Sequence, residues 1–358
     1  MKLALTVARY ELKQRRRSAA WLILMGVCVA VLVATSLLVW FGTDNGEEFG
    51  VLLHPTLVYM ALLLILVVSP TLSGNAINGD REHQTLAAIQ ITRATTAEII
   101  LGKFLAATVT GLGFVAVTLP FLVLAAILGE VPATTVLSNL GVLLAEVMVV
   151  SAVGIGVSGL IARSLFSVAT AYLVVAGLTI GTGLFFGLFS LADKVEVKSD
   201  YRGVVLNEQG EFAQDADGKY LCEPWISSTY SEPRTDRTWW ILAANPFVII
   251  ADATPHRWED GHPKGFFTSV SVGVRELQLP PKTHTAYDEC AYMNSSAIEQ
   301  RNHDEARSAY NREELAGTVP SWWAGLLFQG VLAGALLFGA HRRTHLPAKH
   351  MPPGTRIA

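Results

Sequence analysis

The run AAWLILMGVCVAVLVATSLLVWF, residues 19–41, contains no charged side chain and decides the class of this protein. A helix needs about 20 predominantly apolar residues to cross the hydrocarbon core of a membrane, where every backbone polar group must be paired within the chain. Five more stretches meet this requirement, at residues 51–73, 104–128, 134–162, 166–191 and 321–340. The sequence therefore predicts an all-α polytopic membrane protein with six transmembrane helices.

The Lys and Arg residues outside residues 193–320 all fall on one side of this six-span pattern. They lie before the first predicted helix, between the second and third, between the fourth and fifth, and after the sixth. Because cytoplasmic loops are enriched in Lys and Arg, we expect both termini in the cytoplasm, in the plasma or inner membrane of a bacterium. A cleaved signal peptide is the competing interpretation, but residues 19–41 exceed the about 7–15 residues of its apolar region.

Residues 193–320, between the fifth and sixth predicted helices, then lie outside the cell. They hold 21 of the 30 acidic residues but 13 of the 27 basic ones, so this region is acidic. Turn-rich sequence around short alternating pieces such as residues 201–206 predicts a partly β or irregular extracytoplasmic domain. Cys222 and Cys290 are the two cysteines of this region, and an oxidising exterior makes them a candidate disulfide.

Residues 239–253, WWILAANPFVIIADA, are apolar but too short to span a membrane, and Asn245-Pro246 interrupts any helix. We expect a re-entrant or interfacial segment, with a core helix of the external domain as the alternative. The tail 341–358 is predicted to be cytoplasmic.

The basic residues 1–18 suit an interfacial helix. Leu3, Val7 and Tyr10 share one helical face, and Lys2, Arg9, Lys13 and Arg16 share the opposite face. A simple basic topology anchor is the alternative.

Glu146 is the one ionisable residue deep within a predicted span, where a carboxylate is costly unless it is neutralised, paired or hydrated. It is either a polar point on a translocation pathway or a protonated group hydrogen-bonded to a neighbouring helix. Gln329 in the last span is a weaker candidate of the same kind, and a helix-to-helix hydrogen bond is the alternative for it.

No ATP-binding loop GxxxxGK[ST], no GxSxG and no HExxH occurs in the sequence. His256, His262, His284 and His303 lack the spacing of metal ligands. We therefore expect no enzymatic activity, metal or cofactor in the chain alone, and its charge pattern indicates no nucleic-acid partner.

The stretch GDREHQTLAAIQITRATTAEIILGK, residues 79–103, lies in the predicted cytoplasmic segment 74–103. Asp80 to Glu82 provide an acidic helix start, Leu86 contributes to an apolar patch, and Thr95 with Glu98 predicts a capping box. A structured, amphipathic loop between two spans is suited to docking a soluble partner. A solvated connector is the alternative.

This stretch resembles the segment between the second and third spans of ABC-2 type transporter permeases, and residues 1–18 look like the elbow helix of that family. The matching residues are Gly79, Asp80, Arg81, Glu82, Thr85, Leu86, Thr92, Glu98, Ile99, Gly102 and Lys103. Gln84 and Arg93 depart from the Gly and Pro that are frequent in the family, and residues 193–320 exceed its usual short loop.

The resemblance implies a permease subunit of an ATP-driven exporter. It would work with a second permease copy or homologue and with two separate ATPase subunits, which bind ATP and Mg²⁺. Gly79, Asp80, Arg81, Glu82, Thr85, Leu86 and Glu98 would couple it to the ATPases. The apolar spans favour lipophilic or amphipathic cargo, such as a drug, lipid or peptide. A secondary transporter or channel, or a membrane-anchored external binding or sensor module, is the alternative.

Overall fold

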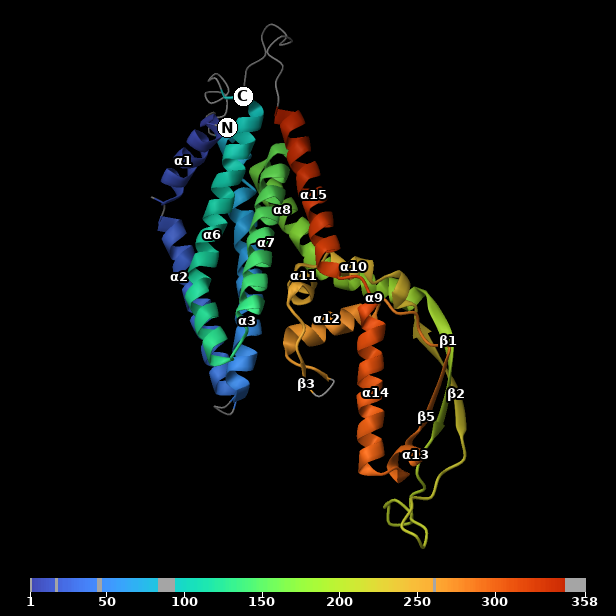
Figure 1. Ribbon diagram of the computed structural model, residues 1–358. Helices are drawn as coiled ribbons and strands as arrows, with labels where there is room; N and C mark the ends of the chain where they lie inside the picture. The colour runs from blue at the N-terminus through green and yellow to red at the C-terminus, as the bar shows by residue number, and fades with distance from the viewer. Residues whose placement is uncertain (1, 17–18, 44–46, 83–93, 260–261, 345–358) are drawn as a thin grey trace.

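The computed structural model describes residues 2–16, 19–43, 47–82, 94–259 and 262–344, most of them helical (Figure 1). Six of its helices are long and apolar enough to cross a membrane, which confirms the predicted number. The first four are α2 (Ala19–Gly42), α3 (Glu47–Ser73) extended by α4 (Ala76–Glu82), α6 (Thr96–Leu128) and α7 (Ala133–Leu160). The fifth consists of α8 (Ser164–Ala176), η1 (Gly177–Gly181) and α9 (Thr182–Ala192), and the sixth is α15 (Ser321–Thr344).

The start of α1 (Lys2–Arg16) and the end of α15 lie at one end of the helical bundle, which we call the terminal end (Figure 1). The end of α2, the start of α3 and the turn from α6 to α7 lie at the opposite, far end (Figure 1). α3 packs against both α6 and α7 in one apolar core that contains Leu57, Leu62, Phe114 and Leu143. α7 also packs closely against α15, since a Cβ atom on Gly156 would lie 2.6 Å from Cβ of Leu336.

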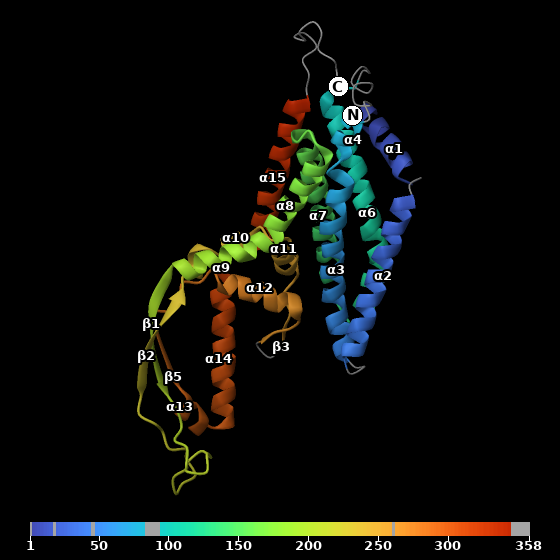
Figure 2. The same ribbon diagram turned by 180° about the vertical axis from the view of Figure 1, so that it is seen from behind.

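The fifth apolar helix bends away from the bundle at η1, a single π-helical turn. α9 then leads outward into the first strand, as both views show (Figures 1 and 2). The wide turn leaves backbone oxygens available, and Nδ2 of Asn245 donates to the carbonyl of Thr179 at 2.7 Å and to Oγ1 of Thr182 at 2.9 Å. The amide of Asn245 therefore fixes the bend.

The segment 239–253 forms two short helices, α10 (Trp240–Ala243) and α11 (Pro246–Ala253). Asn245 caps α11 by accepting from the backbone N–H of Phe247 at 2.9 Å, and Pro246 begins the helix. Ile249 and Ile250 are fully buried in the same apolar core as α3 and α7. The segment thus belongs to the core of the bundle. It leads through strands β3 (Trp258–Glu259) and β4 (His262–Pro263) to helix α12 (Phe266–Glu276).

A module that we call the external module, because it lies outside the helical bundle, follows α9 and precedes α15, away from the terminal end (Figures 1 and 2). Its three strands have the order β2-β1-β5, with β1 antiparallel to β2 and parallel to β5. The strands are β1 (Lys194–Arg202), β2 (Ile226–Pro233) and β5 (His284–Asp288), and two helices complete the module, α13 (Glu289–Asn294) and α14 (Ala297–Ala316). The part-β character expected of this region is present, but β1 begins seven residues before the alternating piece 201–206.

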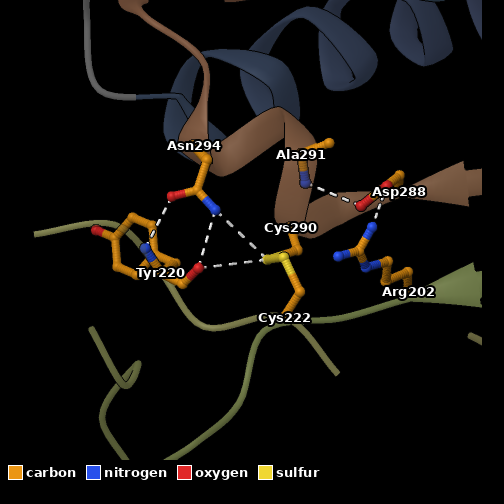
Figure 3. The surroundings of a disulfide bond; sticks show 7 residues. All are labelled: Arg202, Tyr220, Cys222, Asp288, Cys290, Ala291 and Asn294. Atoms are coloured by element: carbon orange, nitrogen blue, oxygen red, sulfur yellow. Dashed lines mark hydrogen bonds and ion pairs between the residues drawn. A yellow bond between two sulfur atoms is a disulfide. The ribbon is translucent and has the colours of Figure 1, made fainter. Parts of the chain in front are cut away.

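A disulfide joins Cys222 and Cys290, the candidate pair, with 5.4 Å between their Cα atoms (Figure 3). Cys290 lies on α13 and is fully buried. Beside it, the side chain of Asn294 accepts from the backbone N–H of Tyr220 at 2.8 Å and donates to its carbonyl at 2.9 Å. The bridge and Asn294 together attach the loop between β1 and β2 to α13.

Candidate functional site

Lys103 lies at the terminal end of the bundle with a side chain that is 1% exposed. Its ammonium group contacts the carboxylate of Glu11 on α1, the carboxylate of Asp80 on α4 at 2.6 Å, and the carbonyl of Ala76 at 2.9 Å. The ammonium group donates hydrogen bonds to Glu11 and to the carbonyl of Ala76, and its contact with Asp80 is an ion pair. We call Glu11, Asp80 and Lys103 the Lys103 triad. It joins the helix before the first apolar helix, the start of segment 74–103 and the third apolar helix.

The first helix, α1 (Lys2–Arg16), lies directly against α6. A Cβ atom on Gly102 would come within 2.7 Å of both the carbonyl oxygen of Ala4 and Cβ of Val7, so only glycine permits this approach. Ala4 and Ala8 are buried at the contact, whereas Leu3 and Tyr10 are exposed. Of the apolar face predicted for an interfacial helix, Leu3 and Tyr10 thus point away from α6, while Val7 contacts Gly102. The stripe that faces α6 continues instead from Ala4 and Ala8 to the charged residues Glu11 and Arg15, because these find partners there.

Arg15 extends the same contact. Its guanidinium donates to the carbonyl of Leu72 at 3.0 Å and to Oγ1 of Thr110 at 3.4 Å, and lies 3.9 Å from the carboxylate of Glu11. Two cations thus face two carboxylates between α1, α3 and α6.

Helix α4 is also tied to the terminal ends of α7 and α8. The backbone N–H groups of Ile77 and Asn78 donate to Oγ of Ser158, at 3.0 and 3.2 Å. Arg81 donates to the carbonyl of Gly159 at 3.4 Å. Glu82 is exposed and accepts from the backbone N–H of Ser164, the first residue of α8, at 3.4 Å. A displacement of α4 must therefore move α7 and α8, or break these bonds.

The remaining residues of the predicted coupling set are distributed as follows. Gly79 lies in α4, and a Cβ atom there would meet only the side chain of Asn75 at ordinary contact distance. Thr85 and Leu86 lie outside the residues that the structure describes. Thr95 and Glu98 form the predicted capping box, which is confirmed, and it begins α6 at Thr96. The described members therefore flank residues 83–93 on both sides.

Glu146 and Gln329 come together in the middle of the α7–α15 interface, and both side chains are fully buried. Nε2 of Gln329 donates to the carbonyl of Ala244 at 3.0 Å. Among the described residues, Oε1 of Gln329 and both oxygens of Glu146 have no hydrogen-bond partner of good geometry. The side chain of Gln329 nevertheless lies close enough to the carboxyl group of Glu146 to interact with it. The two candidate pathway residues thus form one polar site between two of the apolar helices.

Asp252 is the centre of a second buried polar cluster, at the junction of α11, α12 and α15, and its side chain has no exposed surface. One carboxylate oxygen accepts from Oγ of Ser271 at 2.5 Å and from Nε of Arg275 at 2.8 Å. The other accepts from the backbone N–H of Ser321 at 2.5 Å and of Trp322 at 3.1 Å. A carboxylate at a helix N-terminus satisfies orphan N–H groups. Asp252 therefore connects α12 to the beginning of the sixth apolar helix.

Sequence reasoning missed the central role of Lys103, which it used as one of the basic residues that set the orientation and as a residue of the family-like segment. It also missed Glu11, Ser158 and Asp252. A usable signal existed for Lys103, because a lysine between Gly102 and a long apolar run must be paired if the helix continues through it. No local pattern marks Ser158 or Asp252, whose partners lie far away in the sequence.

Within the described ranges, no group of three or more His, Cys, Asp or Glu side chains is arranged to hold a metal ion. A comparison with models of known protein families finds no match to this chain, and a comparison with curated proteins finds none either.

Proposed function

We propose that this chain is the permease subunit of an ATP-driven exporter. It would form the translocation pathway together with a second copy or a homologue, while two separate ATPase subunits bind ATP and Mg²⁺. The observation that supports this most is the construction at the terminal end. Residues 83–93 are flanked by α4 and α6, and the Lys103 triad and the bonds of α4 connect these flanks to α1, α7 and α8.

This construction suits the transmission of a displacement from a soluble partner to the apolar helices. A soluble partner that contacted residues 83–93 differently in its ATP-bound and ATP-free states would displace α4 and α6 together. A partner can shift the equilibrium of the helices only by such a difference in contact free energy. Glycines on the outward faces of the fifth and sixth apolar helices, such as Gly183 and Gly330, have open space beside them, which suits close packing against a second copy.

Copurification with an ATPase is the first test of this proposal, and charge reversal at Glu82 is the sharper one. Glu82 is exposed and outside the triad, so Glu82→Lys should leave the fold intact while it breaks the contact with Ser164. We expect transport per ATP hydrolysed to fall by about 10-fold, within the usual range of coupling between sites. The measurement is vesicle transport and ATP hydrolysis by the reconstituted complex.

Glu208→Lys, an exposed change in the external module, is the matched control and should leave the ratio unchanged. Equal coupling in Glu82→Lys and wild type, or failure of the chain to bind any ATPase, would contradict the proposal.

Glu146→Gln tests whether the α7–α15 polar site belongs to the pathway. An amide has nearly the shape of a carboxyl group and can form a hydrogen bond with the amide of Gln329, so the melting temperature should stay close to that of wild type. Transport should change by several fold, because the amide cannot ionise. Glu196→Gln in the external module serves as the control. Normal transport by Glu146→Gln would leave this residue a structural role only.

A further inference from the structure

A cleft at the far end of the bundle lies between the first turns of α3, the turn from α6 to α7 and the residues that lead into α12. It consists of two adjoining cavities of about 50 and 220 Å³, which share Val51, Gly129, Arg257, Lys264 and Gly265 in their walls. His54 lines the smaller cavity, and Glu130 lines only the larger one. The smaller cavity is therefore walled by two cations and a histidine, without a carboxylate among its described lining residues.

The beginning of α12 faces the same cleft. Gly265 is its N-cap residue, with a φ of 87°, and no side chain caps the helix. The first N–H groups of a helix have no partner within it, and together with the helix dipole they favour an anion. Gly265, Phe266 and Thr268 all line the smaller cavity.

His54 provides an independent indication of a ligand. Its side chain is 2% exposed, and Nε2 has no hydrogen-bond partner among the described residues. A buried polar atom without a partner costs free energy, so such an atom in the wall of a cavity indicates a group that completes it. Lys264 pairs with the exposed carboxylate of Glu259, while Arg257 has no ion pair within the part of the chain that the structure describes.

An apolar groove of about 350 Å³ adjoins this cleft and shares Pro55 and Phe266 with it. Leu52, Tyr59, Met60 and Leu63 line it along α3, and Phe247 closes one side. The hydroxyl of Tyr59 already donates to the carbonyl of Phe247 at 3.0 Å, so it offers no donor to the groove. From Val51 to Leu63 the helix rises roughly 18 Å at about 1.5 Å per residue, close to the about 15 Å of one leaflet's hydrocarbon.

We infer that the cleft and the groove together bind one amphiphile, with its phosphate or carboxylate headgroup against Arg257, Lys264, His54 and the start of α12, and its hydrocarbon chain along α3. The order of the two parts fits a lipid that sits beside α3, with a polar site at the end of the helix and an apolar one towards its middle. This inference does not depend on export, because a lipid can bind here whatever the spans transport.

The test uses the full chain purified in dodecyl maltoside and titrated with phosphatidylglycerol that carries a fluorescent acyl chain. The double variant Arg257→Gln, Lys264→Gln should bind at least about 10-fold more weakly, since charge-assisted hydrogen bonds are lost. Leu63→Trp, which fills the groove, should also weaken lipid binding. The control Lys198→Gln, Arg237→Gln removes the same two charges from the external module and should change nothing. Melting temperatures verify that each variant is folded.

Competitors identify the occupant. A fatty acid or phosphatidylglycerol should displace the probe at micromolar concentration, whereas diacylglycerol and inorganic phosphate should be far weaker. Equal competition by diacylglycerol would overturn the headgroup site, and equal competition by inorganic phosphate, with Leu63→Trp unaffected, would overturn the acyl groove. If Leu63→Trp instead abolished a dimer and left lipid binding unchanged, the groove would belong to a second copy and the inference would be wrong.

Discussion

Replacing Lys103 with glutamate should lower the free energy of unfolding by about 3–5 kcal/mol, the usual range for breaking a buried ion pair. The change puts three carboxyl groups in a space where Lys103 now compensates Glu11 and Asp80. We expect α1 to separate from α6 and α4 to lose its attachment. Denaturant unfolding in micelles measures the stability, and protease cleavage within residues 2–16 reports on α1.

Two further variants separate charge from shape. The neutral triple change Glu11→Gln, Asp80→Asn, Lys103→Met should recover most of the lost stability, because a buried ion pair replaced by neutral groups of similar volume is often close to neutral. Lys219→Glu, on an exposed loop of the external module, should have almost no effect. A Lys103→Glu protein as stable as wild type would show that the triad makes no net contribution.

The triad also changes how a charge reversal at Asp80 must be interpreted. Such a variant would lose coupling through local unfolding as readily as through loss of a partner contact, since Asp80 pairs with a buried lysine. Transport by the neutral triple variant is more informative. Restored stability with impaired coupling would assign a transmitting role to the triad beyond its contribution to the fold.

Asp252→Ala should have an effect of similar size, about 3–5 kcal/mol. The change leaves Arg275, whose side chain is 15% exposed, without its carboxylate, and it removes the acceptor of the first N–H groups of α15. We expect α12 to detach from the beginning of α15, which limited proteolysis between residues 277 and 320 would detect. Asp236→Ala, which breaks the more exposed pair with Arg234, is the matched control and should cost about 1 kcal/mol or less.

The effect of Asp252 should depend on pH in a defined direction. Burial alone favours the protonated carboxyl group, but the hydrogen bonds from Ser271 and Arg275 outweigh it and hold the pKa of Asp252 below its ordinary value. A carboxyl group with a lowered pKa stabilises the fold above the ordinary value, and this contribution is lost as pH falls through the lowered one. Wild type and Asp252→Ala should therefore differ at neutral pH and converge in acid. A constant difference throughout would contradict this role of the charge.

The apolar helices could be located from sequence because a long uncharged apolar run is compatible with few structures other than a long helix. The first was expected at 19–41 and is Ala19–Gly42, and the fifth was expected at 166–191 and is 164–192. The third was expected to begin at residue 104, yet α6 begins at Thr96. The helix start itself was marked by the predicted capping box of Thr95 and Glu98, and the pairing with Glu11 and Asp80 allows Lys103 to lie inside the helix.

What could not be predicted depends on contacts between distant residues. The π-helical turn of η1 has no local signal, since its stabilising amide comes from Asn245. β1 was missed although residues 194–198 alternate between polar and apolar side chains, and its partner strands begin far away, at residues 226 and 284. The Glu146–Gln329 pair was foreseen as two separate polar residues, and only the packing of α7 on α15 places them together.

The parallel pairing of β1 with β5 has a consequence for the way this protein is made. Synthesis proceeds from the N-terminus, so β1 and β2 can form their ribbon early, while the third strand emerges only after α11 and α12. Such distant pairings close slowly. α15 is translated later still. Until then, the face of α7 that contains Gly156 remains uncovered in the nascent chain. Nascent chains stalled before residue 284 should therefore be the species that chaperones and quality-control proteases recognise.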